Sequence, residues 1–271
     1  MSHRQIGWAT GYVVLRTIVW AVLIAMLAPI LVVVLMSFQE KSFIAFPPSA
    51  FSTRWYAEFF ANVKYRDAIV NSMIVGFSAA AIATVVGSLA AIGTVRLRRL
   101  PGRKLITFLA IAPAVLPPII LAIGLFPVSG WLSLNGTLYA VIGAHAVVGV
   151  PYPFITVSGA LRGYSDRLEI ASMVLGANPL QTFRWVTFPM IRSGLLSGFI
   201  FAFAASLDEL VLAMFLSRPS TRTLPLQLWE QLRYQVTPEV AAAATMLILV
   251  AVVVLLLSSG IGGTKTAKER T

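Results

Sequence analysis

LEIASMVLGANPLQTFRWVTFP, residues 168–189, is the most informative stretch of this chain, because it is half-polar and lies between two long hydrophobic runs. Four of its apolar residues have the i, i+3, i+4, i+7 spacing of one helix face: Ile170, Met173, Val174 and Ala177. A second apolar face follows: Leu180, Phe183 and Thr187. We expect Gly176 to end the first helix, Pro179 to begin the second and Pro189 to close the unit. The stretch therefore predicts a rigid helix–turn–helix between two membrane spans.

The composition of the whole chain indicates a membrane protein. Only 11% of the 271 residues are charged and the mean hydropathy is +0.85, whereas soluble domains carry about 25% charged residues. A soluble fold could not bury this much apolar surface, so the solvent must be lipid. The net charge of +11 does not indicate nucleic acid, because the basic residues flank the apolar spans, where they set membrane orientation.

Long runs without charge predict an all-α membrane protein with six transmembrane helices. Helices are favoured over a barrel because each run is long and continuous. The longest run holds two spans, which a turn at Pro127, Gly130 and Asn135-Gly136 separates. We place all six in one permease-like domain, residues 1–271, with spans at about 16–38, 68–95, 105–126, 137–161, 194–216 and 239–259.

The distribution of basic residues predicts the orientation. Fourteen of the twenty-one Lys and Arg residues lie at the termini and in 96–104 and 162–193, and seven lie in the opposite segments. Because cytoplasmic segments carry more Lys and Arg, we expect both termini and the loop 162–193 in the cytoplasm. Pro113, Pro117 and Pro118 are expected to kink or unwind the third span.

The sequence lacks the residue patterns that several kinds of chemistry require. There is no GxxxxGK[ST] phosphate loop, since the GGTKT near the C-terminus lacks the glycine before lysine. Without cysteine, and with only His3 and His145, no His/Cys metal cluster is expected. His145 fits either a hydrogen-bonded packing histidine or a pathway residue. We therefore expect no catalytic site, metal or cofactor in this chain.

An acid pair interrupts the fifth span. Asp208 and Glu209 are expected roughly 20 Å into a hydrocarbon core of about 30 Å. A carboxylate at that depth needs a partner, a water-filled cavity or a cationic ligand. Asp208 follows Phe201 in helical register, and an acid near an aromatic face suits an alkylammonium cation. Glu209 shares a stripe with small residues that allow close helix packing: Gly198, Ala202 and Ala205.

The opening stretch resembles the cytoplasmic loop of binding-protein-dependent ABC transporter permeases, the EAA loop, whose usual form is close to EEAAxxLGAxxxxxFxxVxLP. The spacing agrees throughout, with Ile170 and Ser172 in place of the second Glu and the second Ala. The matching residues include Glu169, Ala171, Gly176, Ala177, Phe183 and Pro189. The segments WYAEFFANVKYRDAIVNS, GVPYPF and SLDELVLAMFL are similar to the permeases for spermidine and putrescine.

This resemblance implies the fold and the partners. It implies a type I ABC importer core in the bacterial cytoplasmic (inner) membrane, with a second permease subunit completing the pathway. Two ATPase subunits, which bind ATP and Mg, would dock on the six loop residues named above. An extracytoplasmic solute-binding protein would deliver the solute. The substrate pathway is expected to involve Asp208, Glu209, Phe201 and Tyr152.

We therefore expect a permease subunit that imports a polyamine or a similar small cationic solute. One alternative is an ABC permease for another small solute, such as an amino-acid-like compound, an opine, a phosphonate or ferric iron. Alternatives from other classes are an ion-driven secondary transporter and a membrane enzyme. An ATPase that co-purifies with the chain separates the ABC permeases from these two.

Overall fold

The computed structural model describes residues 3–43, 46–97, 99–235 and 237–262. Within these residues every named element of secondary structure is a helix. Arg98 of the basic segment 96–104 and the basic C-terminal tail, 263–271, lie outside the described residues. The predicted all-α class is confirmed. The helices are α1 (His3–Ser37), α2 (Arg54–Ala61), α3 (Val63–Arg96), α4 (Arg103–Val115), α5 (Pro118–Trp131), α6 (Leu138–Gly149), α7 (Pro151–Arg162), α8 (Arg167–Val174), α9 (Pro179–Thr182), the π-helical turn η1 (Phe183–Thr187), α10 (Phe188–Asp208), α11 (Val211–Leu216), the 3₁₀ turn η2 (Pro219–Thr221), α12 (Leu224–Tyr234) and α13 (Pro238–Gly262).

The chain divides into two compact units: unit 1 is Met1–Asn62 with Glu230–Leu249, and unit 2 is Val63–Trp229 with Val250–Thr271. In unit 1, the indole Nε1 of Trp55 donates to the carbonyl of Gln39 over 2.5 Å, and the hydroxyls of Ser37 and Tyr56 lie 2.6 Å apart. These contacts hold α2 against the end of α1. The single domain over 1–271 stays a prediction.

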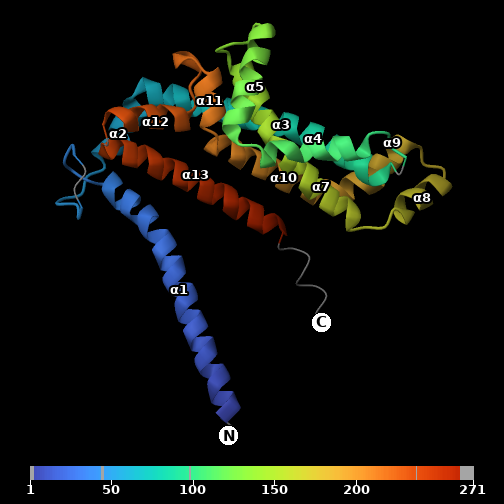
Figure 1. The fold of residues 1–271 in the computed structure, drawn as a ribbon, viewed down its shortest axis with the longest axis horizontal. Coiled ribbons are helices and arrows are strands. Elements are labelled where there is room, and N and C mark those ends of the chain that lie inside the picture. Colours follow the sequence, from blue (N-terminus) through green and yellow to red (C-terminus); the bar gives the residue numbers. More distant parts are fainter. Residues whose placement is uncertain (1–2, 44–45, 98, 236, 263–271) are drawn as a thin grey trace. The chain divides into compact units, whose positions relative to one another are not determined.

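Unit 2 contains the functional segments, and α3, α6, α7 and α10 pack together at its centre (Figure 1). Small residues make this packing close. A Cβ added to Gly198 of α10 would lie 2.5 Å from the Cα of Pro153, and one added to Gly87 of α3 would lie 2.7 Å from the carbonyl of Val150. The small stripe predicted from the sequence therefore serves contacts within this chain, because α7 fills the space that Gly198 leaves.

Four helical runs are long and apolar enough to cross a membrane: Gly11–Ser37, Val63–Arg96, Leu138–Arg162 and Pro179–Asp208. The pair α4 and α5 makes a fifth candidate if it counts as one span, and Pro238–Val254 is a shorter apolar helix. Each of these helices overlaps one of the six predicted spans, although Pro179–Asp208 begins and ends earlier than the predicted 194–216. The count of six, and the side on which each terminus lies, stay predictions.

The third predicted span, 105–126, is broken at Pro117 and Pro118, as its prolines predicted, while Pro113 lies inside α4. It consists of α4 and α5, which meet at an angle of 112°. Leu116 and Pro117 are extended at the break, and Pro118 begins α5. Two consecutive prolines explain it, because each lacks an N–H and each disfavours helical backbone in the residue before it.

The turn after this span begins later than predicted. Pro127 and Gly130 lie inside α5, which continues to Trp131. The chain turns after it, where Ser133 and Gly136 have φ of 57° and 73°. Of the residues predicted to form the turn, only Asn135-Gly136 lies in it, since glycine reaches positive φ without strain.

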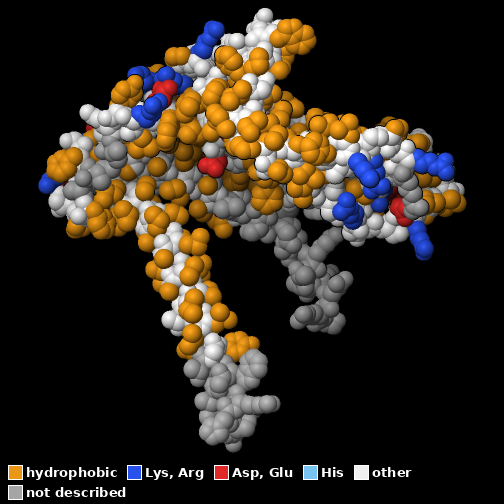
Figure 2. All heavy atoms as spheres, viewed as in Figure 1, with side chains coloured by type: hydrophobic (Ala, Val, Ile, Leu, Met, Phe, Trp, Pro, Cys, Tyr) orange, Lys and Arg blue, Asp and Glu red, His pale blue; other side chains and the backbone are white. Residues whose placement is uncertain are grey.

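The surface of unit 2 agrees with lipid as its solvent. Figure 2 shows Lys and Arg side chains gathered near the end that carries α8 and α9, while the visible face of the helices beside it is mostly hydrophobic. Exposed apolar side chains include Val85, Leu89, Phe108, Ile123 and Ile155. A soluble protein rarely exposes so continuous an apolar surface.

Candidate functional site

The candidate site is the coupling segment, residues 163–187, which joins α7 to α10 at one end of unit 2 (Figure 1). It contains α8, the break at Gly176, α9 and η1. The predicted helix pair with a break at Gly176 is therefore present. No residue of α8 is fully buried, so the segment lies at the surface and contacts the rest of unit 2 through a few side chains.

The break between α8 and α9 is a well-defined turn. Gly176 has φ of 93°, its N–H donates to the carbonyl of Met173, and the N–H of Ala177 donates to the carbonyl of Ser172. This pattern ends helices and requires left-handed backbone at the glycine. On the other side, Asn178 and Gln181 form a reciprocal capping box with hydrogen bonds of 2.9 and 2.8 Å.

The second helix of the segment does not stop at Pro189, as the spacing had suggested. Helix α9 passes through η1 directly into α10, and Pro189 lies in the first turn of α10. Proline is tolerated there because a first-turn N–H has no intrahelical acceptor. Helices α9 and η1 are thus continuous with the fifth span, which is a direct mechanical connection. The π-helical turn at the junction is a rare feature that often marks functional sites.

A polar cluster fixes α8 to the body of unit 2. The Oε1 atom of Glu169 lies 3.1 Å from Nε of Arg96, the last residue of α3, and both side chains are mostly buried. The same Oε1 accepts a hydrogen bond from the Tyr164 hydroxyl at 2.5 Å and one from the Thr187 hydroxyl at 3.0 Å. Glu169 therefore connects α8 to α3, to the start of the segment and to η1. A charged acceptor with several donors makes a strong anchor.

Two further contacts stiffen this cluster. The guanidinium of Arg96 stacks 4.3 Å from the centre of the Tyr164 ring. A tyrosine hydroxyl keeps its proton at neutral pH, burial raises the pKa of the Tyr164 phenol further, and the hydroxyl donates to Glu169. The hydroxyls of Ser172 and Thr182 lie 2.8 Å apart and join α8 to α9.

The opposite side of the segment is apolar and exposed. Leu175 exposes 88% of its surface, Val174 81%, Leu180 76% and Trp185 71%. These four residues form the apolar knobs of the coupling segment. A polar anchor on one side and apolar knobs on the other suit a rigid element that docks a partner.

The residues predicted for coupling fall into different roles. Glu169 turns inward as the anchor, so it does not present its carboxylate to a partner. Ala171 and Gly176 are exposed, and Ala177 is half-buried. Phe183 is partly exposed, with its ring 6.2 Å from that of Phe188. The exposed knobs beside these positions, Leu175 above all, are the better candidates for contact.

The acid pair does not lie within a continuous helix. Helix α10 ends at Asp208, Glu209 is extended, and α11 begins at Val211. Asp208 is exposed and makes no ion pair with any described residue. Glu209 is buried, and its Oε1 accepts from the backbone N–H of Leu212 at 3.0 Å. The acid pair therefore interrupts the predicted fifth span, 194–216, as the sequence indicated, and Glu209 caps the start of α11.

The other two predicted pathway residues, Phe201 and Tyr152, differ in exposure. Phe201 is exposed on α10, on the same helix face as Asp208, since seven residues make nearly two turns. Tyr152 of α7 is half-buried against the cluster of Ala83, Ala202 and Phe203. Asp208 and Phe201 are thus the predicted pathway residues that are open to a ligand.

His145 is a buried residue that joins two helices. Its Nδ1 lies 2.8 Å from the Ser206 hydroxyl, which connects α6 to α10. His145 is therefore a hydrogen-bonded packing histidine, which is one of the two roles that the sequence allowed. Among the described residues no three His, Asp or Glu side chains are placed to hold a metal ion.

Sequence reasoning missed the three partners of Glu169. Arg96 is visible in the sequence only as the first residue of the basic run, Tyr164 carries no pattern of its own, and Thr187 was placed only on the second face of the opening stretch. No local signal could join residue 96 to residue 169, because the contact depends on how α3 packs beside the segment.

Comparison with known proteins agrees with this geometry. Residues 83–263 match the family model described as binding-protein-dependent transport system inner membrane component. The putrescine transport system permease protein PotI of Escherichia coli is 34% identical over 236 residues, covering 82% of this chain and 83% of that protein. The spermidine/putrescine transport system permease protein PotC of Haemophilus influenzae is 29% identical over 214 residues, covering 79% and 82%. The structure of a bacterial ABC transporter that imports alginate has a TM-score of 0.73 at 17% identity, covering 96% of this chain and 98% of the matched chain, and shows the shared fold.

Proposed function

We infer the function from one premise, which is that this chain belongs to the family of binding-protein-dependent transport system inner membrane components. It is therefore an inner-membrane permease subunit of an ABC importer, and it works with an ATPase and a solute-binding protein. We propose that the imported solute is a polyamine such as putrescine or spermidine. We further propose two ATPase subunits, which hold ATP and Mg, and a second permease subunit that completes the pathway.

The observation that carries the coupling role is the two-sided construction of the coupling segment. The Glu169 carboxylate fixes α8 to α3 with an ion pair of 3.1 Å, while Val174 and Leu175 face outward. An ATPase that binds the apolar knobs would move the coupling segment as a rigid body, because the segment is anchored and is not a flexible loop. Because η1 leads into α10 without a break, that movement would reach the fifth span directly.

The proposal of a cationic solute rests on the relatives and on one carboxylate. Both relatives are named for solutes that carry several ammonium groups. In this chain Asp208 is exposed, unpaired among the described residues, and on the same face as the exposed ring of Phe201. A carboxylate with an aromatic face is the chemistry that binds an alkylammonium group. The second permease subunit would enclose this site.

The deciding experiment is solute-stimulated ATP hydrolysis by the complex that co-purifies with this chain, reconstituted in proteoliposomes with its solute-binding protein. We expect putrescine or spermidine to raise hydrolysis several-fold. The panel also contains an amino-acid-like compound, an opine, a phosphonate and ferric iron. Stimulation by one of these and not by a polyamine would overturn the solute, and the absence of a co-purifying ATPase would contradict the coupling role.

A further inference from the structure

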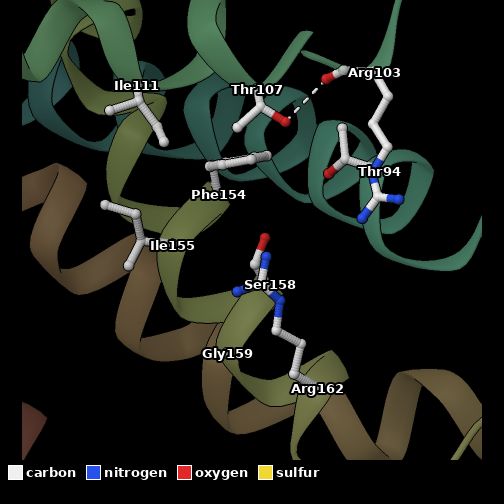
Figure 3. A pocket seen from close by; sticks show the side chains of 9 residues that line it. All are labelled: Thr94, Arg103, Thr107, Ile111, Phe154, Ile155, Ser158, Gly159 and Arg162. Atoms are coloured by element: carbon white, nitrogen blue, oxygen red, sulfur yellow. Dashed lines mark hydrogen bonds between the residues drawn. The ribbon is translucent and has the colours of Figure 1, made fainter. Parts of the chain in front are cut away.

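A pocket of about 340 Å³ lies between the ends of α3, α4 and α7, outside the coupling segment and the acid pair (Figure 3). The lining residues come from the last turn of α3, from α4 and from α7. The distribution of basic residues predicts that this is the cytoplasmic end of the bundle. On that prediction the pocket lies at the depth where lipid headgroups meet the protein.

The lining changes from basic to apolar in the same direction on two helices. Along α4 it runs from Arg103 through Thr107 to Ile111, at steps of four residues. Along α7, which packs on α4, it runs from Arg162 through Ser158 back to Ile155. Both sequences cover about 10–12 Å at a rise of 1.5 Å per residue. The basic residues thus meet at one end of the pocket and the apolar residues lie toward the membrane interior.

The polar end has unused binding capacity. Neither Arg103 nor Arg162 forms an ion pair with a described residue. Ser158 is 7% exposed, and its hydroxyl has no hydrogen-bond partner. In Figure 3 the hydroxyl of Ser158 and the Arg162 guanidinium both point toward the space between α4 and α7. A buried hydroxyl normally has a partner, so this one points to a ligand.

We propose that this pocket binds an acidic phospholipid of the cytoplasmic leaflet. The phosphate would lie between the guanidinium groups of Arg103 and Arg162 and accept a hydrogen bond from Ser158. An acyl chain would follow the apolar end, beside Ile111 and Ile155. Basic pockets between membrane helices on the cytoplasmic side are suited to lipid headgroups. The adjoining apolar surface favours a lipid over a soluble anion, because only a lipid has an acyl chain to bury there.

The test measures lipid adducts on the full chain, purified with its partners in neutral detergent, by native mass spectrometry. The probes are phosphatidylglycerol, phosphatidylcholine with the same acyl chains, and glycerol 3-phosphate, which has the phosphate without the chains. We expect the wild type to prefer phosphatidylglycerol over phosphatidylcholine at least tenfold and to ignore glycerol 3-phosphate.

Two variants test the two ends of the pocket. The double variant Arg103→Gln/Arg162→Gln should lose about 25-fold in affinity for phosphatidylglycerol, because each basic residue near an acidic lipid contributes about fivefold. Its control is Arg184→Gln/Arg192→Gln, which removes the same charge elsewhere on the cytoplasmic side. Gly159→Leu should fill the pocket, since a Cβ at Gly159 meets nothing within 4 Å.

The control for Gly159→Leu is Gly143→Leu on α6, where a Cβ also meets nothing within 4 Å. It should bind lipid as the wild type does, while Gly159→Leu should lose at least tenfold. Equal binding of the two lipids, or equal losses in either control, would overturn the proposal. Binding of glycerol 3-phosphate as strongly as phosphatidylglycerol would replace the lipid by a soluble phosphate.

Discussion

Glu169 of α8 and Arg96 at the end of α3 form an ion pair with 3.1 Å between Oε1 and Nε, although 73 residues separate them. The pair fixes the orientation of the coupling segment relative to the central helices. Both groups are largely shielded from water, so their attraction is screened less than that of a surface pair.

Breaking this pair should destabilise the chain far more than breaking an exposed one. We expect Glu169→Gln to lower the free energy of unfolding by about 2–3 kcal/mol, because the Arg96 charge is left shielded and unpaired. The matched control is Glu58→Gln, whose pair with Arg54 is exposed and should contribute less than about 1 kcal/mol. A double-mutant cycle with Arg96→Gln, followed by denaturant unfolding in mixed micelles, measures the coupling. Equal losses for Glu169→Gln and Glu58→Gln would contradict the anchor role.

Gly176 should tolerate substitution according to backbone preference and not according to size. A Cβ there meets no atom within 4 Å, but φ is 93°. We therefore expect Gly176→Asn to retain most of the ATPase during purification and Gly176→Val to lose it, since β-branched residues avoid positive φ. The control is Gly143→Val, which has equal space and helical backbone. Equal ATPase retention by both Gly176 variants would show that the left-handed turn is not needed.

The acid pair should divide into a transport role and a structural role. Asp208→Asn should reduce polyamine uptake roughly 10- to 100-fold at normal complex yield, because a charge-assisted contact is worth about 1.5–3 kcal/mol. Glu209→Ala should instead lower the yield, since Leu212 N–H loses its cap, a loss of about 1–2 kcal/mol. Glu209→Gln keeps an acceptor oxygen and should retain most of that yield. Initial uptake rates and complex yields are measured together, and normal uptake by Asp208→Asn would remove Asp208 from the pathway.

The orientation in the membrane can be tested directly because the chain has no cysteine. Single cysteines at Leu175 and Trp131, which expose 88% and 85% of their surfaces, report on the two sides. We expect a membrane-impermeant maleimide to label Trp131→Cys in intact cells and Leu175→Cys only after the membrane is opened. Labelling of Leu175→Cys in intact cells would reverse the topology inferred from the basic residues.

Local signals were sufficient for much of this fold. Long uncharged runs predicted α1, α3 and the α6–α7 pair, because a lipid solvent leaves a helix as the way to satisfy the backbone. Gly176 and Pro179 were correctly placed at the break between α8 and α9, since positive φ and a fixed φ are properties of single residues. The family loop could be recognised for the same reason, as its pattern lies within about twenty residues.

The tertiary structure decided what each polar side chain does. Spacing could not show that Glu169 turns toward Arg96, because the polar side of a short helix can face water or another polar group. Spacing also could not show that Glu209 caps α11 while the Asp208 side chain stays exposed. Nor could it show that the helix continues from η1 into α10 through Pro189. The direction of a side chain depends on which distant helix packs beside it, and for Glu169 that helix, α3, ends 73 residues earlier in the chain.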